Sequence, residues 1–172
     1  MHLETERLIL RPITEDDFDS WCEVLGDAET MKHYPAPYDA AGVRRWLDWT
    51  LNNYAQYGFG LWAMILKENG RFIGDCGITM QNINGQTLPE IGYHINKAYW
   101  RRGYATEAAR KCMEYAFETL RFPAIYSYMT SDNAASYGVA VKNGMQLVEE
   151  YDDHGEPHRV YAMTKEAWEQ KI

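Results

Sequence analysis

Apolar residues recur at helical spacing in three stretches of the chain. From 105 to 120 they fall three and four positions apart without a break, which predicts one long amphipathic helix. The same spacing at 43–54 predicts a second helix. Before the stretch 18–25, Thr14 and Asp17 stand three apart as in a capping box, so a further helix is expected to begin there.

Short apolar runs, many of them aromatic, predict strands between these helices. The runs at 61–66, 71–80 and 90–95 are separated by ENG and by QNINGQTLP, which favours an antiparallel meander. The segment MKHYPAPY at 31–38 carries two prolines and is expected to be an irregular loop. Further strands are expected at 8–11, 124–129, 145–151 and 159–164, and a short helix at 133–143. We therefore predict a mixed α+β fold, with a twisted, mostly antiparallel sheet of about seven strands flanked by about four helices.

Length and charge limit the classes of protein. With 172 residues, 46% of them hydrophobic, the chain can bury one sizeable core, so we expect residues 1–172 to form a single domain. A formal net charge of -8 disfavours a nucleic-acid surface and gives a cationic amine a favourable average field. The chain begins without the apolar core of a signal peptide, and no run approaches the ~18 apolar residues of a membrane span. A cytoplasmic protein with no membrane partner is expected.

The cysteines and histidines do not indicate a metal site. Three cysteines lie far apart without a CxxC pair, which argues against a disulfide framework and against zinc. His154 and His158 are four apart, but Gly155 and Pro157 make a helix between them implausible. We therefore expect no metal.

The stretch WRRGYATEAAR at 100–110 places two arginines and a glycine directly before the long helix. The first N–H groups of a helix lack intrahelical partners and carry a partial positive charge, so such a junction can bind an anion. Gly103 lets a ligand approach the backbone closely. Arg101 and Arg102 add charge, and Thr106 adds a hydroxyl donor. A phosphate or pyrophosphate would suit this turn, and an ordinary helix entry with solvated arginines is the alternative.

These segments together resemble the GNAT superfamily of acyl-CoA-dependent N-acyltransferases, and more narrowly its RimJ/RimL-like branch. The resemblance spans nearly the whole chain, through ETERLILRPITEDD, DAETMKHY, FIGDCGI, EIGYHINKAYWRRGYATEA, and N-A-A-S followed by VKNGM. Its most specific part matches the Q/R-x-x-G-x-G/A turn of the superfamily, with Trp100 in place of the usual Gln or Arg. It implies a GNAT-like fold.

The resemblance also implies that acetyl-CoA is the co-substrate. Backbone amides of the turn would wrap its pyrophosphate, and the strand that begins at Glu90 would pair with its pantetheine arm. The residues that would bind acetyl-CoA are Tyr93, His94, Ile95, Arg101, Arg102, Gly103, Tyr104, Ala105, Thr106, Asn133 and Ser136. For His94, the backbone more than the side chain is expected to face the cofactor.

The activity that the resemblance implies is direct transfer of an acetyl group to a primary amine in a ternary complex. The acceptor would be a protein N-terminus or a small amine. A homodimer is compatible with this branch of the superfamily. The alternative is a module of the same fold that binds or senses acyl-CoA without turning it over.

The resemblance gives roles to a few side chains near the predicted turn. Glu90 is the candidate general base, because some GNAT members have a catalytic glutamate there and partial burial would raise its pKa. A solvated glutamate, or a contact to a cationic substrate, is the alternative. Ser136 matches a serine assigned as general acid in RimL-like enzymes, whereas Ala140 stands where many members have a tyrosine for that role. Tyr34 and Tyr38, on the proline-rich loop, are expected to contact the acceptor.

Overall fold

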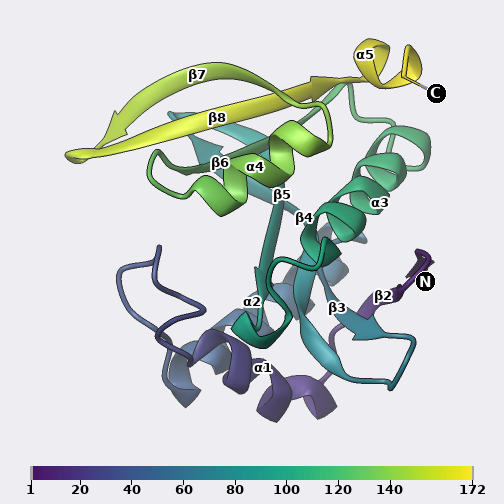
Figure 1. Ribbon diagram of the computed structural model, residues 1–172, viewed down its shortest axis with the longest axis vertical. Helices are drawn as coiled ribbons and strands as arrows, with labels where there is room; N and C mark the ends of the chain where they lie inside the picture. Colours follow the sequence, from purple (N-terminus) through teal and green to yellow (C-terminus); the bar gives the residue numbers. More distant parts are fainter. Residues whose placement is uncertain (1, 172) are drawn as a thin grey trace.

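The chain folds around one eight-stranded sheet with the strand order β1-β2-β3-β4-β5-β6-β8-β7 (Figure 1). The computed structural model describes residues 2–171. Neighbouring strands are antiparallel except for β5 and β6, which run parallel. The strands are β1 (Leu3–Glu4), β2 (Leu8–Pro12), β3 (Leu61–Leu66), β4 (Phe72–Ile83), β5 (Gln86–Ile95), β6 (Ala124–Thr130), β7 (Gln146–Asp153) and β8 (Glu156–Thr164).

Five α-helices accompany the sheet, and two of them cover each of its faces. In Figure 1, α3 and α4 lie against one side of the strands, α1 and α2 lie beyond the other, and α5 follows β8 at the end of the chain. The helices are α1 (Phe18–Leu25), α2 (Ala40–Tyr57), α3 (Tyr104–Glu118), α4 (Ala134–Lys142) and α5 (Lys165–Glu169). No helix between residues 2 and 171 has the length and apolar content needed to cross a bilayer.

The prediction of a mixed α/β fold is confirmed, with one more strand and one more helix than expected. The additional elements, β1 and α5, have two and five residues, which is too short to show a periodic pattern. The segment QNINGQTLP, expected to separate two strands, instead belongs mostly to them, because β4 and β5 continue to a tight turn at Asn84-Gly85. Both turn residues have positive φ, 48° and 84°, as a two-residue hairpin turn of this kind requires.

Two hydrophobic cores lie on opposite faces of the sheet, and β3 contributes to both. Trp62, Met64 and Leu66 pack in the core beneath α3, whereas Leu61 and Ala63 pack with α1 and α2. Because side chains alternate along a strand, a strand covered on both faces must be apolar at almost every position. This explains why LWAMIL reads as a continuous apolar run.

The strands β5 and β6 pair at a single position, Glu90 with Tyr126, and diverge beyond it. The sheet is therefore opened in its middle, on the side where β5 continues toward His94 and β6 toward Thr130. In Figure 1 the upper part of the sheet, β6 to β8, turns away from the lower part along β5.

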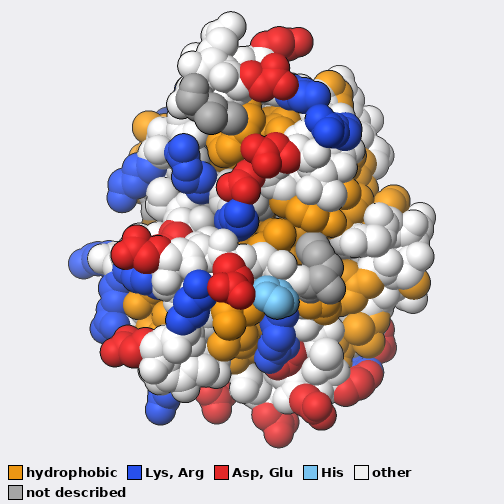
Figure 2. All heavy atoms as spheres, turned by 90° about the vertical axis from the view of Figure 1, so that its right-hand side faces the viewer, with side chains coloured by type: hydrophobic (Ala, Val, Ile, Leu, Met, Phe, Trp, Pro, Cys, Tyr) orange, Lys and Arg blue, Asp and Glu red, His pale blue; other side chains and the backbone are white. Residues whose placement is uncertain are grey.

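Acidic and basic side chains are mixed on the face that includes α3 and the chain termini (Figure 2). Although the net charge of the chain is -8, this face is not uniformly acidic.

Candidate active site

Two cavities meet where β5 and β6 diverge. We name them the Glu90 cavity, of about 340 Å³, and the Gly103 cavity, of about 560 Å³, after one residue in the lining of each. The first opens beside α2 and the second beside the start of α3. The residues that line both are His33, Tyr34, Tyr93, His94, Asn133 and Ser136. A ligand in one cavity would therefore lie next to a ligand in the other.

The start of α3 forms one wall of the Gly103 cavity. Gly103 is the N-cap of the helix with φ of 81°, and no side chain caps the amides that follow. Arg101, which precedes it by two, also has a positive φ of 61°, so the backbone turns sharply. Because Lys32, Arg101 and Lys142 line the same cavity, uncapped amides and three cationic residues border one space. This arrangement can bind an anion.

Of the predicted cofactor residues, all but Arg102 line the Gly103 cavity. The side chain of Arg102 lies over the ring of Tyr99, with 5.7 Å from its Cζ to the ring centroid. Its backbone oxygen accepts a hydrogen bond from Nη1 of Arg7 at 2.9 Å. Arg102 therefore contributes to the shape of the turn, and its guanidinium lies outside the cavity lining.

A carboxylate in the first turn of α3 fixes that helix to the start of the chain. Oε1 of Glu107 accepts hydrogen bonds from Oγ1 of Thr5 at 2.5 Å and from the backbone N–H of Arg7 at 2.8 Å. Nε of Arg7 lies 2.7 Å from Oε2 of the same carboxylate. Burial acts in the opposite direction, but the hydrogen bonds from Thr5 and Arg7 lower the pKa of Glu107. These contacts fix the turn at Gly103 to the start of the chain.

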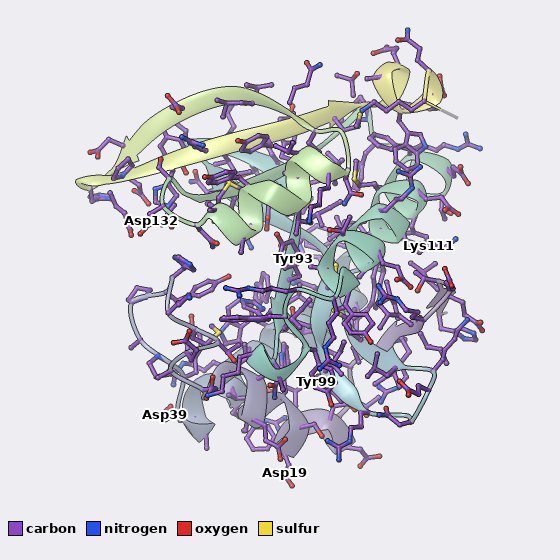
Figure 3. The ribbon with its side chains drawn as sticks, in the orientation of Figure 1. Asp19, Asp39, Tyr93, Tyr99, Lys111 and Asp132 are labelled. Atoms are coloured by element: carbon purple, nitrogen blue, oxygen red, sulfur yellow. The ribbon has the colours of Figure 1, made fainter. Side chains whose placement is uncertain are left out.

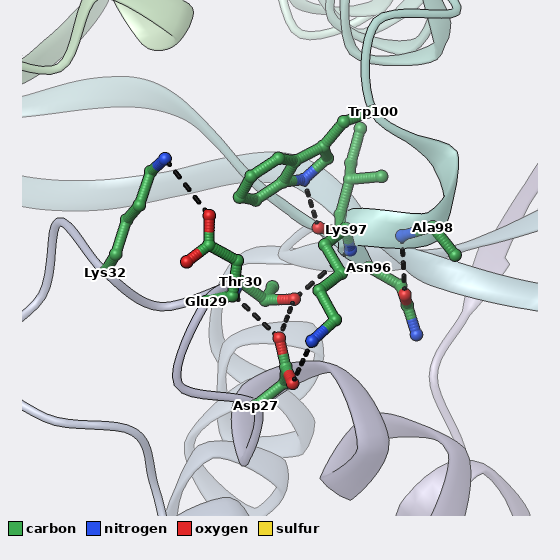
Figure 4. A network of polar contacts seen from close by, with 9 residues as sticks. Asp27, Glu29, Thr30, Lys32, Asn96, Lys97, Ala98 and Trp100 are labelled. Carbon is green, nitrogen blue, oxygen red and sulfur yellow. Dashed lines mark hydrogen bonds and ion pairs between the residues drawn. The ribbon is translucent and has the colours of Figure 1, made fainter.

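Residues 27–30, which lead into the proline-rich loop, are fixed to the same region by a polar network (Figure 4). Asp27 accepts hydrogen bonds from the backbone N–H and hydroxyl of Thr30, both at 2.8 Å, and from Nζ of Lys97 at 3.1 Å. The backbone N–H of Lys97 donates to the Thr30 hydroxyl, and Nε1 of Trp100 donates to the backbone oxygen of Ile95. These contacts hold the loop beside the end of β5, where both cavities lie.

The structure separates the two tyrosines that were predicted to contact the acceptor. Tyr34 lines both cavities and lies 5.2 Å from the ring of His94. Tyr38 lines neither cavity and packs edge-on against Trp46 at 5.8 Å. Trp46 and Trp49, on α2, line the Glu90 cavity directly. The acceptor wall predicted for this loop is therefore shared with α2.

The side chain of Tyr93 points from β5 toward the beginning of α4 (Figure 3). Its hydroxyl donates to Oγ and to the backbone oxygen of Ser136, both at 3.1 Å. Burial raises the pKa of Tyr93, so the phenol keeps its proton. Asn133, the N-cap of α4, accepts from the backbone N–H of Ser136 at 3.2 Å. Ala140, at the position where many GNAT members have a tyrosine, is 3% exposed and packs in the core.

Glu90 is buried more completely than the sequence indicated. Only 8% of the residue is exposed. Burial raises the pKa of its carboxyl well above the usual 4.5, and the backbone amide of Tyr128 acts in the opposite direction. Glu90, Gly92 and His94 share one face of β5, as alternate residues of a strand do. A Cβ on Gly92 would lie 3.1 Å from Oε1 of Glu90, so the absence of a side chain there leaves space beside the carboxyl.

The imidazole of His94 is part of a hydrogen-bonded chain that the sequence analysis missed. Nδ1 of His94 lies 3.0 Å from both carboxylate oxygens of Asp75, on β4. Nε1 of Trp21, from α1, donates to Oδ2 of Asp75 at 2.8 Å. A charge within the apolar strand FIGDCGI was an available signal, because a fully buried carboxylate requires partners.

Within residues 2–171, no three histidine, cysteine or acidic side chains lie together in a way that could hold a metal ion. His158 instead stacks between Tyr128 and Tyr151, with its Nδ1 2.9 Å from the backbone oxygen of Glu156. Aromatic, hydroxyl, carboxyl and imidazole groups line the two cavities, together with the cationic residues of the Gly103 cavity.

Comparison with known proteins agrees with this geometry. A family model described as an acetyltransferase (GNAT) domain matches residues 7–146. The uncharacterized protein YkkB of Bacillus subtilis (strain 168) is 36% identical over 160 residues, which cover 92% of this chain and 93% of that protein. Further Bacillus relatives carry the name N-acetyltransferase.

Solved structures show the same fold. An acetyltransferase from Agrobacterium tumefaciens str. C58 is 30% identical with a TM-score of 0.82, over 95% of this chain and 94% of that one. RimL, described as a ribosomal L7/L12 alpha-N-protein acetyltransferase in complex with coenzyme A, has a TM-score of 0.78 at 16% identity, over 97% of this chain and 99% of that one, a likeness of fold alone. The family match and the relatives together show that this chain belongs to the GNAT family of acetyltransferases.

Proposed function

We propose that this N-acetyltransferase is RimJ/RimL-like, with acetyl-CoA in the Gly103 cavity and a primary amine in the Glu90 cavity. The observation that carries the proposal is the junction of the two cavities at the residues they share. Holding two reactants side by side can contribute about 7 to 11 kcal/mol of the barrier reduction. Direct transfer in a ternary complex follows from that juxtaposition.

The residues of the Gly103 cavity fit an acyl-CoA. The uncapped amides after Gly103, together with Arg101 and Lys142, suit the pyrophosphate. Ile95 and Val139 add apolar surface beside them for the uncharged arm. When bound, acetyl-CoA supplies an activated acetyl group and a thiol as leaving group.

The remaining roles concern protons. Glu90 is proposed to bind the acceptor amine or to assist its deprotonation, and its buried carboxyl lies in the cavity assigned to that amine. Ser136 is proposed to donate a proton to the leaving thiolate, and its hydroxyl is oriented by Tyr93. The carbonyl and amide groups at Tyr93, His94 and Ile95 are proposed to pair with the pantetheine arm.

The wider setting of the enzyme rests on the sequence. We propose that residues 1–172 act as one domain in the cytoplasm, without a nucleic-acid, membrane or metal partner. The acceptor is a protein N-terminus or a small amine, and a homodimer is compatible with the RimJ/RimL-like branch.

Calorimetric titration tests the proposed cofactor site. The wild type is expected to bind acetyl-CoA and to bind pantetheine, which lacks the pyrophosphate, much more weakly. Gly103→Glu, which places a carboxylate at the anion turn, is expected to abolish acetyl-CoA binding. Gly70→Glu is the matched control, because Gly70 also has positive φ, 71°, but lies in the β3–β4 turn. Equal binding by the two variants would contradict the proposed site.

A second measurement separates catalysis from binding alone. Release of free CoA thiol is followed with a panel of primary amines at saturating acetyl-CoA. Release that depends on the amine is expected of the enzyme. Binding of acetyl-CoA without any amine-dependent release would favour the acyl-CoA-sensing module.

A further inference from the structure

The second proton-handling group of the site is the imidazole of His94. It lines both cavities, whereas Glu90 lines the Glu90 cavity alone. His94 follows Glu90 by four positions, which is roughly 13 Å along β5. The proposed attack of an amine on a thioester would take place at the junction of the cavities. His94 lies at that junction, and Glu90 lies toward the acceptor side.

The surroundings of His94 fix its orientation. Its ring is 5.2 Å from that of Tyr34 and 5.5 Å from that of Trp46, and the residue is only 8% exposed. Because a carboxylate only accepts hydrogen bonds, Nδ1 carries the proton that it donates to Asp75. Nε2 is then the free acceptor of the neutral ring. Among residues 2–171, only Nδ1 of this imidazole has a polar side-chain or backbone partner.

Asp75 has the geometry of a residue that positions a histidine. It is fully buried, and its second role is to accept the indole N–H of Trp21. A buried carboxylate behind an imidazole fixes its tautomer and stabilises the imidazolium that forms when the ring takes a proton. The other titratable groups that line the Glu90 cavity beside the ring are His33 and Tyr34 on the loop, Glu90 and Tyr93 on β5, Tyr128 on β6, and Glu156 and His158 on β8. Helices α1 and α2 contribute the uncharged indoles of Trp21, Trp46 and Trp49. The phenol of Tyr54 on α2 lies near Asp75, and burial raises its pKa.

On the premise of the proposed acetyl transfer, we propose that Nε2 of His94 is the base that takes a proton from the acceptor amine, with Asp75 as its positioning residue. The nitrogen forms a bond to the thioester carbonyl carbon as the carbon–sulfur bond breaks. The electron pair of that bond leaves with the CoA sulfur. The proton moves from nitrogen to Nε2 and is released to solvent when the products leave. Glu90 then binds the acceptor beside Gly92.

The test compares two acceptors of nearly equal size and different basicity. They are 2-phenylethylamine, or whichever primary amine a screen shows to be turned over fastest, and its β,β-difluoro analogue. The fluorinated amine is largely unprotonated at neutral pH, so it needs less help from a base. In His94→Gln, whose amide still donates to Asp75, kcat/KM for the ordinary amine should fall roughly 100-fold or more. The loss for the fluorinated amine should be much smaller.

Two further variants keep the result interpretable. Asp75→Asn retains an acceptor for Trp21 and should show the same dependence on the amine, with a smaller loss. His154→Gln is the matched control, because His154 also pairs with an aspartate, Asp153 at 2.7 Å, but on the exposed β7–β8 turn. Its kinetics should equal those of the wild type.

The outcomes distinguish the two proposals. An equal loss for both amines in His94→Gln, with acetyl-CoA affinity unchanged, would overturn the role of His94 as a base. If Glu90→Gln, and not His94→Gln, lost much more kcat/KM with the ordinary amine than with the fluorinated amine, Glu90 would be the base. Absence of turnover by the wild type with every amine would contradict the proposed function itself.

Discussion

The hydroxyl of Tyr93 lies 3.1 Å from Oγ of Ser136 and links β5 to the first turn of α4 across the Gly103 cavity. The tyrosine hydroxyl donates a hydrogen bond to the serine oxygen. The serine hydroxyl can therefore direct its own hydrogen into the cavity. The site thereby contains an oriented hydroxyl although Ala140 is buried where many family members have a tyrosine.

Removal of either hydroxyl should slow turnover. Ser136→Ala deletes the proposed proton donor and is expected to lower kcat by about tenfold, or roughly 1.4 kcal/mol of barrier. Tyr93→Phe should have a smaller effect of the same sign, because only the orientation of the serine is lost. Stopped assays of CoA release give kcat, and calorimetry gives acetyl-CoA affinity. A loss of affinity with unchanged kcat would make Ser136 a binding residue.

The buried carboxyl of Glu90 should make stability depend on pH. Burial raises its pKa above 4.5, so between that value and the raised pKa the folded protein holds a proton that the unfolded chain has released. The contribution of Glu90 to the free energy of unfolding should therefore fall as pH rises, by up to about 1.4 kcal/mol per unit. Glu90→Gln has no such ionisation and should gain relative to the wild type as pH rises from 4.5.

Urea unfolding of both proteins at several pH values measures that difference. The two curves should run parallel below pH 4.5, where the carboxyl is protonated in the folded and in the unfolded state. A constant offset across the whole range would mean that the ionisation of Glu90 is the same in both states.

Replacement of Trp49 should raise KM for the acceptor amine and leave KM for acetyl-CoA nearly unchanged. It lines only the Glu90 cavity, whereas Tyr34 lines both cavities. Trp49→Ala removes a large apolar wall, so KM for an aromatic or alkyl amine should rise about tenfold with little change for acetyl-CoA. Initial-rate kinetics with each substrate varied in turn provide both values. Equal changes for the two substrates would argue against separate cavities.

Glu107 should stabilise the fold as well as the turn. Glu107→Ala removes an acceptor from Thr5 and Arg7 and should lower the free energy of unfolding by about 1 to 3 kcal/mol. Because hydrogen bonds lower the pKa of Glu107, this stabilisation should be complete above about pH 4.5 and be lost as pH falls through the lowered value. Denaturant titrations at pH 7 and pH 3 measure it. A loss that is equally large at both pH values would contradict the role of the ionised carboxylate.

The sequence predicted what local patterns specify. Helical periodicity predicted α3, and Gly103 marked the sharp turn before it, because both depend on neighbouring residues. The short helix α5 was not predicted, because its five residues are too few to show helical periodicity. The hydrogen bond between Asp75 and His94 was not predicted either. It joins residues that are 19 positions apart on adjacent strands, so it depends on the register of those strands. Burial of Glu90 likewise depends on the pairing of β5 with β6, which brings the backbone of Tyr128 to the carboxyl and which no local pattern reveals.

The divergence of β5 from β6 has an evolutionary consequence. The two proposed substrate cavities have partly different walls. The loop and α2 border the cavity proposed for the amine, and the starts of α3 and α4 border the cavity proposed for the thioester. Pro35, Trp46 and Trp49, which line only the Glu90 cavity, can therefore change between species without changing the lining of the Gly103 cavity. The same acyl-CoA cavity can therefore be combined with different amine cavities. A family with this architecture can change its amine substrates while it keeps one acyl donor.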